Sequence, residues 1–112
     1  MKPLRLSLLL VAVLIAGMSA APRPQKFKGV ITDSMCARGD HSAMKMGPTD
    51  AECTTACVYA HGAVYVLFDG KNAYVLSDQK TPEKFAGKKV LVTGSLDAKA
   101  KMIQVVSMTA AQ

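Results

Sequence analysis

The sequence predicts a mainly β domain: a small five-stranded OB-like barrel with a Cys-bearing loop-helix insertion between strands 1 and 2. Three observations predict this class. Five short segments are rich in β-branched and aromatic residues, turn-forming residues separate most of them, and one stretch, residues 33–62, interrupts the β pattern. The OB-fold is a five-stranded Greek-key barrel of this size. Another five-stranded antiparallel barrel or sandwich is the alternative.

The chain begins with the composition of a secretory signal peptide. Basic residues precede an apolar run, 6–16, and small residues follow at 19–21. The run is shorter than the roughly 20 residues that a membrane-spanning helix needs. We expect cleavage after Ala20, so that 1–20 is the signal peptide and 21–26 a flexible lead. The sequence therefore predicts an exported protein, periplasmic or extracellular.

The remaining residues are enough for a single small domain, which we place at 27–109. A domain of this size buries only about 60–65% of its unfolded surface, so a disulfide or a bound metal would stabilise it noticeably. The formal net charge of the chain is +6, and its basic residues are scattered. This pattern argues against a nucleic-acid track.

The five strands are expected at 27–32, 64–68, 73–77, 89–95 and 101–108. Turn-forming residues at 69–72 join the second strand to the third as a hairpin, and residues 96–100 join the fourth to the fifth. Between the third and fourth strands, Thr81, Pro82 and Glu83 indicate a short helical turn.

The second half of the insertion predicts a helix. Thr49 is expected as its N-cap, Glu52 completes a capping box, and Gly62 suits the stop. Cys53 and Cys57 are four residues apart and therefore point to the same side of the helix. Their β-carbons would lie about 5–6 Å apart, farther than in a disulfide, so they are poorly placed to bond to each other. Two thiolates at this spacing can instead hold one metal ion.

Four side chains of the insertion are candidate metal ligands: Cys36, His41, Cys53 and Cys57. The first two lie in a glycine-containing loop that could fold over the helical face carrying the other two. Three sulfurs and one imidazole are the ligands of a closed tetrahedral zinc site. Nearby thioethers favour copper(I) instead, and the loop supplies them from Met35, Met44 and Met46. The sequence therefore predicts structural zinc or bound copper.

A disulfide is the competing interpretation, because exported thiols are usually oxidised. Cys36 would then pair with Cys53 or Cys57, closing a loop worth roughly 3 kcal/mol in the entropy model and leaving one cysteine over. The protein would be a disulfide-stapled module without metal, binding an envelope ligand such as an oligosaccharide or a protein. A thiol redox enzyme that uses an exposed, unpaired cysteine is a third class. No nucleophile and base are spaced for acid–base catalysis, so we assign no catalytic residue.

Three motifs of the chain resemble those of a known family. They are G-V-I-T-D-S-M-C at 29–36, C-T-T-A-C-V at 53–58 and A-G-K-K-V-L-V-T-G at 86–94. They resemble the G-x-I-S-D-S-x-C, C-T-x-x-C-V and A-G-x-x-V-x-V-T-G motifs of small exported bacterial proteins of unknown function with an OB-like domain. Ala37 departs from the glycine that the family usually has there. The resemblance implies a fold and a compartment, and no activity.

Overall fold

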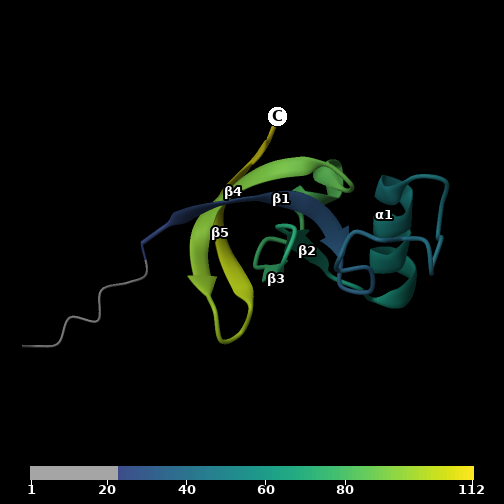
Figure 1. Ribbon diagram of the computed structural model, residues 1–112, viewed down its shortest axis with the longest axis horizontal. Helices are drawn as coiled ribbons and strands as arrows, with labels where there is room; N and C mark the ends of the chain where they lie inside the picture. The colour runs from purple at the N-terminus through teal and green to yellow at the C-terminus, as the bar shows by residue number, and fades with distance from the viewer. Residues whose placement is uncertain (1–22) are drawn as a thin grey trace, which may run out of the picture.

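The structure is a computed structural model that describes residues 23–112, so the predicted signal peptide, 1–20, and the start of the lead, 21–22, lie outside the described residues. Five strands close into a barrel in the order β1-β2-β3-β5-β4 (Figure 1). Neighbouring strands are antiparallel except β3 and β5, which run parallel. The predicted fold class, a small five-stranded barrel with a helix between strands 1 and 2, is confirmed.

The elements in chain order are β1 (Gln25–Asp33), α1 (Asp50–His61), β2 (Tyr65–Phe68), β3 (Ala73–Leu76), the 3-10 helix η1 (Thr81–Phe85), β4 (Lys89–Asp97) and β5 (Met102–Ala110). Each predicted strand, the helix and the short helical turn are found close to their expected places. The strands β1, β4 and β5 are longer than predicted. Their extra residues pair with neighbouring strands, as Gln25 does with Gly94, and a sequence pattern does not reveal such pairing.

Strand β1 is shared between two neighbours. Its first part pairs with β4, and its last residues, from Val30 to Asp33, pair with β2. Gly29 lies where the partner changes, and a Cβ added there would run into the carbonyl oxygen of Phe68. A side chain at this position would separate the two strands, so the glycine allows β1 to bend from one partner to the other.

The interior of the barrel is an apolar core. Its buried residues are Ile31, Tyr65, Leu67, Leu76, Ala86, Val90, Val92 and Ile103. In β4 the buried side chains alternate with partly exposed ones, as expected for a strand with one face inward. A second, smaller cluster consists of Cys53, Cys57 and Ala63, and Val58 of α1 packs against both clusters. The cysteine-bearing insertion therefore has a small core of its own.

The insertion leaves the barrel and returns to it at one place. Asp33 ends β1 opposite Tyr65 of β2, the Ser34 amide donates to the Val64 carbonyl at 2.9 Å, and the Val64 amide donates to the Ser34 hydroxyl at 3.1 Å. The loop and α1 stand beside this end of the barrel (Figure 1). The antiparallel pairing of residues 33–34 with 64–65 thus fixes both ends of the insertion.

Helix α1 has the ends that its sequence predicts. The Thr49 hydroxyl oxygen accepts a hydrogen bond from the Glu52 amide at 3.2 Å and donates to the Glu52 carboxylate at 3.0 Å. Gly62 ends the helix in the left-handed conformation, with φ 67°. These local signals fix the start and stop of the element that carries two of the candidate ligands.

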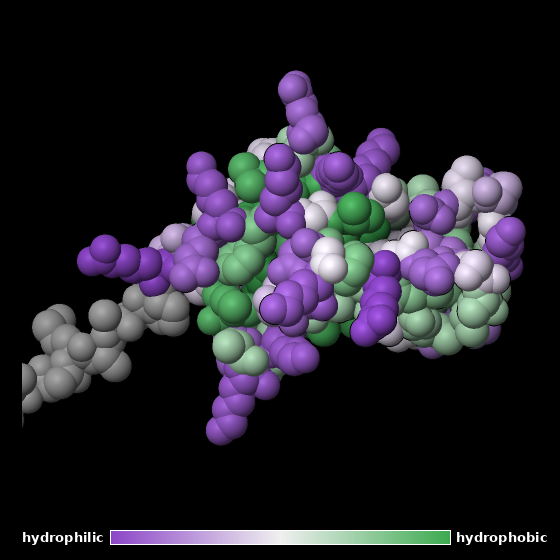
Figure 2. Space-filling view, viewed as in Figure 1, coloured by the Kyte–Doolittle hydropathy of each residue, from purple (hydrophilic) through white to green (hydrophobic). Residues whose placement is uncertain are grey.

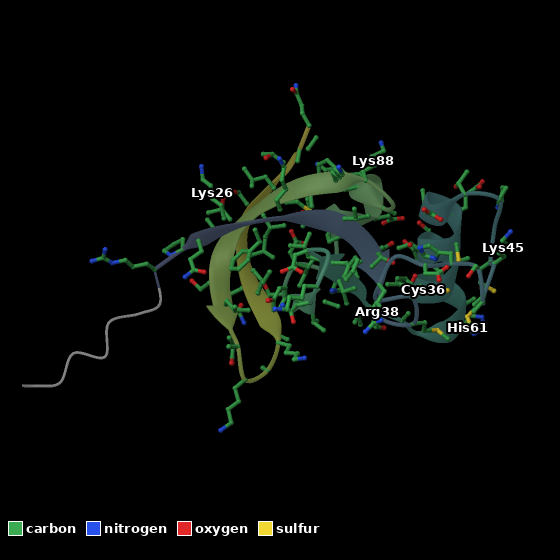
Figure 3. The ribbon with its side chains drawn as sticks, viewed as in Figure 1. Lys26, Cys36, Arg38, Lys45, His61 and Lys88 are labelled. Atoms are coloured by element: carbon green, nitrogen blue, oxygen red, sulfur yellow. The ribbon has the colours of Figure 1, made fainter. Side chains whose placement is uncertain are left out.

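The visible surface carries no broad hydrophobic area. Figure 2 shows hydrophilic side chains projecting around the barrel, with small, separated hydrophobic patches between them. The labelled basic residues Lys26, Arg38, Lys45 and Lys88 lie well apart (Figure 3). Among residues 23–112, no helix has the length and apolar character needed to cross a membrane.

Candidate metal centre

Three of the four predicted ligands form a buried cluster. The ligand atoms of Cys36, His41 and Cys53 all lie within 4.8 Å of one another. The three side chains are 7%, 7% and 1% exposed. Cys36 follows β1, His41 comes from the loop and Cys53 from α1, and Figure 3 shows Cys36 between the end of β1 and the helix. The fold thus brings two sulfurs and one imidazole together in positions suited to a metal ion.

Cys36 is held by a tight turn at the end of β1. The Oδ1 atom of the fully buried Asp33 accepts hydrogen bonds from the amides of Met35, at 2.9 Å, and Cys36, at 3.0 Å. The Thr32 hydroxyl donates to the Cys36 carbonyl at 2.8 Å. Strand and turn together fix the backbone of Cys36 from both sides.

Thr32 also determines how His41 is oriented. Its hydroxyl proton is used on the Cys36 carbonyl, so its oxygen can only accept from the imidazole Nε2, which lies 3.4 Å away. In this arrangement Nε2 of His41 is the donor to Thr32. The other nitrogen, Nδ1, faces the Cys53 sulfur at 3.1 Å. A second partner of this kind orients the ligating nitrogen in most metal sites with histidine.

The Cys53 sulfur is the centre of the loop's hydrogen bonding. It donates to the Met44 carbonyl at 3.0 Å and accepts from the Met46 amide at 3.4 Å. The Nδ1 atom of His41 is a second acceptor for the same thiol proton. The Met44 carbonyl and the His41 Nδ1 atom compete for the single proton of this thiol, so one of these two acceptors is left without it.

Cys57, the fourth predicted ligand, lies beside the cluster and outside the set of three. It is fully buried, one helical turn after Cys53, in the same small core. Burial raises the pKa of its thiol from 9.0 to about 11, and the nearby Asp33, Cys53 and Cys36 add to the rise. The charges of the other two thiols thus affect the pKa of Cys57, so all three sulfurs lie close enough to influence one another.

Without a cation, this environment favours neutral thiols. Burial also raises the pKa of Cys36, and the Asp33 carboxylate contributes. The second carboxylate oxygen of Asp33 is buried and has no hydrogen-bond partner within the described part of the chain. Uncompensated negative charge at the site opposes further ionisation, and a bound cation would reverse that preference.

All three thiols are free. Among residues 23–112, neither alternative disulfide is formed, whether between Cys36 and Cys53 or between Cys36 and Cys57. The methionines differ in their surroundings: the side chains of Met35 and Met44 are 46% and 37% exposed, and that of Met46 packs against the cysteine cluster. Met46 is therefore the thioether best placed to influence the choice of metal.

The sequence did not reveal the supporting groups. Thr32 and the backbone of Met44 and Met46 have no motif of their own, because their roles depend on the folded loop. Fold and site together define a class: a small β-barrel domain with a buried cysteine–histidine cluster on an insertion. Comparisons with family models, curated proteins and solved structures found no match to the chain.

Proposed function

We propose that the domain binds one metal ion, zinc or copper(I), through Cys36, His41 and Cys53, with Cys57 as the fourth ligand. The observation that carries the proposal is the buried cluster whose ligand atoms lie within 4.8 Å of one another. Thiolate and imidazole are the ligands that both ions prefer in proteins. The function of the protein is then to hold a metal outside the cytoplasm, for its own stability or for storage and delivery.

The distances agree with a site ready to close around an ion. A tetrahedral zinc ion at about 2.3 Å from sulfur and 2.1 Å from nitrogen sets these ligand atoms about 3.6 Å apart. The His41 nitrogen and the Cys53 sulfur are now 3.1 Å apart, at hydrogen-bond distance. Loss of the thiol proton and a separation of a few tenths of an ångström would admit the metal.

The choice between the two metals depends on the fourth ligand and on Met46. Cys57 would complete a closed set of three sulfurs and one nitrogen, which is typical of structural zinc. A thioether in contact with the cysteine cluster favours copper(I). Competitive loading with both ions, followed by elemental analysis, distinguishes these outcomes.

The test is the native mass of the purified protein with and without a chelator, together with its zinc and copper content. We expect one ion per chain, removed by the chelator, and three free thiols. The His41→Ala variant should lose the metal. The His61→Ala variant is the matched control and should keep it, because His61 is exposed at the end of α1.

A metal-free protein whose mass is lower by two thiol hydrogens would overturn this proposal and favour the disulfide-stapled module. Cys57→Ser tests the fourth ligand separately. A loss of affinity as large as that of Cys36→Ser supports a four-ligand site, and an unchanged affinity limits the site to three protein ligands.

Export is also a proposal, supported by the signal-peptide composition of residues 1–20 and by the family that the chain resembles. Expression of the full chain in a bacterial host should yield a mature protein outside the cytoplasm that begins at Ala21, as read by intact mass. A product retained in the cytoplasm at full length would contradict it.

A further inference from the structure

A cavity of about 310 Å³ lies against the candidate metal centre. Its walls come from the loop after Gly39 and the start of α1, and its rim includes the exposed residues Ser42 and Lys45. Both His41 and Cys53 border it. They are almost fully buried, so they lie at its floor. The cluster therefore has one side that can be reached from solvent.

The two remaining cysteines are placed differently. The described residues that line this cavity do not include Cys36 or Cys57. Cys36 is held by the turn after β1, and Cys57 shares the small core with Cys53. An ion bound in the cluster would therefore be approached from this cavity at His41 and Cys53.

We infer that this cavity is where the bound metal is exchanged with an external thiol-bearing ligand, an inference that rests on the proposed metal-binding function. The sulfur of the incoming thiol forms a bond with the ion, and the bond between the ion and the Cys53 sulfur breaks. The proton of the incoming thiol passes to Cys53. No electron changes hands, so the step needs no oxidant or reductant.

The surroundings of Cys53 suit a ligand that leaves and returns. When it is a thiolate on the metal, the Met46 amide is available to donate to it, at 3.4 Å in the present arrangement. When it regains a proton, the Met44 carbonyl accepts it at 3.0 Å. The sulfur therefore has a backbone partner both on the metal and after it leaves, so neither position leaves it without a hydrogen bond.

The experiment is the transfer of metal from the loaded protein to a coloured chelator, pyridylazoresorcinol for zinc or bathocuproine sulfonate for copper(I). N-acetylcysteine is added as the probe thiol, and N-acetylserine is the matched control without sulfur. We expect the transfer rate to rise in proportion to the N-acetylcysteine concentration and to be unaffected by N-acetylserine. A rate that does not depend on the thiol overturns the inference, because the metal would then leave by simple dissociation.

The second part of the experiment uses a variant whose side chain fills the mouth of the cavity. Ser42→Trp should slow the thiol-dependent transfer about tenfold, equivalent to about 1.4 kcal/mol in the barrier, with no change in metal affinity. Ser107→Trp places the same side chain at an exposed position of β5, away from the cavity, and should leave the rate unchanged. If Ser42→Trp does not fold, Lys45→Trp takes its place.

The two proposals fail in different ways. A protein that binds no metal at all overturns both. A protein that binds one ion per chain and exchanges it at the same rate in Ser42→Trp and in the original chain retains the metal-binding function, and only the exchange route through this cavity is overturned.

Discussion

At the scale of single residues, the least conspicuous member of the site is Thr32. It is almost fully buried and ligates nothing, yet its hydroxyl bonds both to the backbone of Cys36 and to the ring of His41. A hydroxyl has one proton to give and can accept at its lone pairs. With its own proton on the Cys36 carbonyl, the Thr32 hydroxyl faces Nε2 of His41 as an acceptor, and Nδ1 faces the Cys53 sulfur.

The Thr32→Val variant tests this role. Valine keeps the shape but loses both bonds, so we expect the metal affinity to fall about 10- to 100-fold, the usual effect of removing a group that orients a metal ligand. Nitrogen NMR of the imidazole should report a mixture of tautomers in the metal-free variant. Thr54→Val is the control, because the buried Thr54 hydroxyl has no hydrogen-bond partner among residues 23–112. Equal affinity losses in both variants would contradict the assignment.

The buried thiols predict a pH dependence of the metal-free protein. Burial raises the pKa of Cys57 from 9.0 to about 11, so the folded state holds this proton more tightly than the unfolded state. The resulting stability is fully present below pH 9 and is lost as the pH rises toward 11. At 1.36 kcal/mol per pKa unit, this loss is roughly 2–3 kcal/mol. Urea unfolding of the reduced protein at several pH values measures it. The Cys57→Ala variant should have a flatter profile.

The candidate ligands could be proposed from the sequence, whereas the residues that hold them in place could not. The spacing of cysteines and histidine, and the helix implied by Thr49 and Gly62, named Cys36, His41, Cys53 and Cys57 as one site. The structure groups the first three and leaves Cys57 beside them. No local sequence pattern marks Asp33 as buried, and the structure buries it completely. Its burial depends on how the loop after β1 packs against α1, and no local pattern encodes that packing.

At the scale of elements, the contact between α1 and the barrel depends on Gly87. Its φ is 73°, its amide donates to the Ile31 carbonyl at 2.8 Å, and a Cβ added to it would lie 2.9 Å from the backbone nitrogen of Ala51. The first turn of α1 therefore rests directly on the backbone that leads into β4. A side chain here would push away the helix that carries Cys53.

Gly87→Ala should destabilise the protein, and Gly70→Ala is the matched control. Both glycines have positive φ, so alanine costs about 1–2 kcal/mol in each case. At Gly70, nothing in residues 23–112 beyond its two chain neighbours lies within 4 Å of the added Cβ, so only that conformational cost applies. Denaturant unfolding should give a larger loss for Gly87→Ala, with weaker metal binding as well. Equal losses would mean that α1 moves aside freely.

The limits of the sequence at this scale are also physical. The strands and α1 were found because turn residues and caps act over three or four positions. The parallel pairing of β3 with β5, and the division of β1 between β4 and β2, join segments far apart in the chain. Such pairings depend on the closure of the whole barrel, and strand patterns alone do not specify them.

At the scale of the whole molecule, the two cores divide the protein into parts of different stability. The barrel has its own apolar interior, and the smaller cluster around Cys53 and Cys57 contains few apolar side chains. A region with few buried apolar contacts opens more readily than one with many. The bound metal would therefore stabilise the insertion more than the barrel.

Removal of the metal should loosen the insertion and leave the barrel folded. At a free metal concentration about 100 times the Kd, binding contributes about 2.7 kcal/mol to the stability of the folded insertion. Hydrogen exchange after chelation should show lost protection from Cys36 to His61 and retained protection in β4 and β5. Loss of protection throughout the chain would contradict the division into two parts.

The pairing of residues 33–34 with 64–65, which fixes both ends of the insertion, has an evolutionary consequence. Because Ser34 and Val64 are bonded to each other, the register of β1 and β2 does not depend on how long the chain between them is. Lengthening a surface loop costs little free energy, since the entropy of closure grows slowly with length. Residues can therefore be gained or lost between His41 and Thr49 while the barrel stays as it is. New ligand sets, and preferences for other metals, can arise on one inherited scaffold.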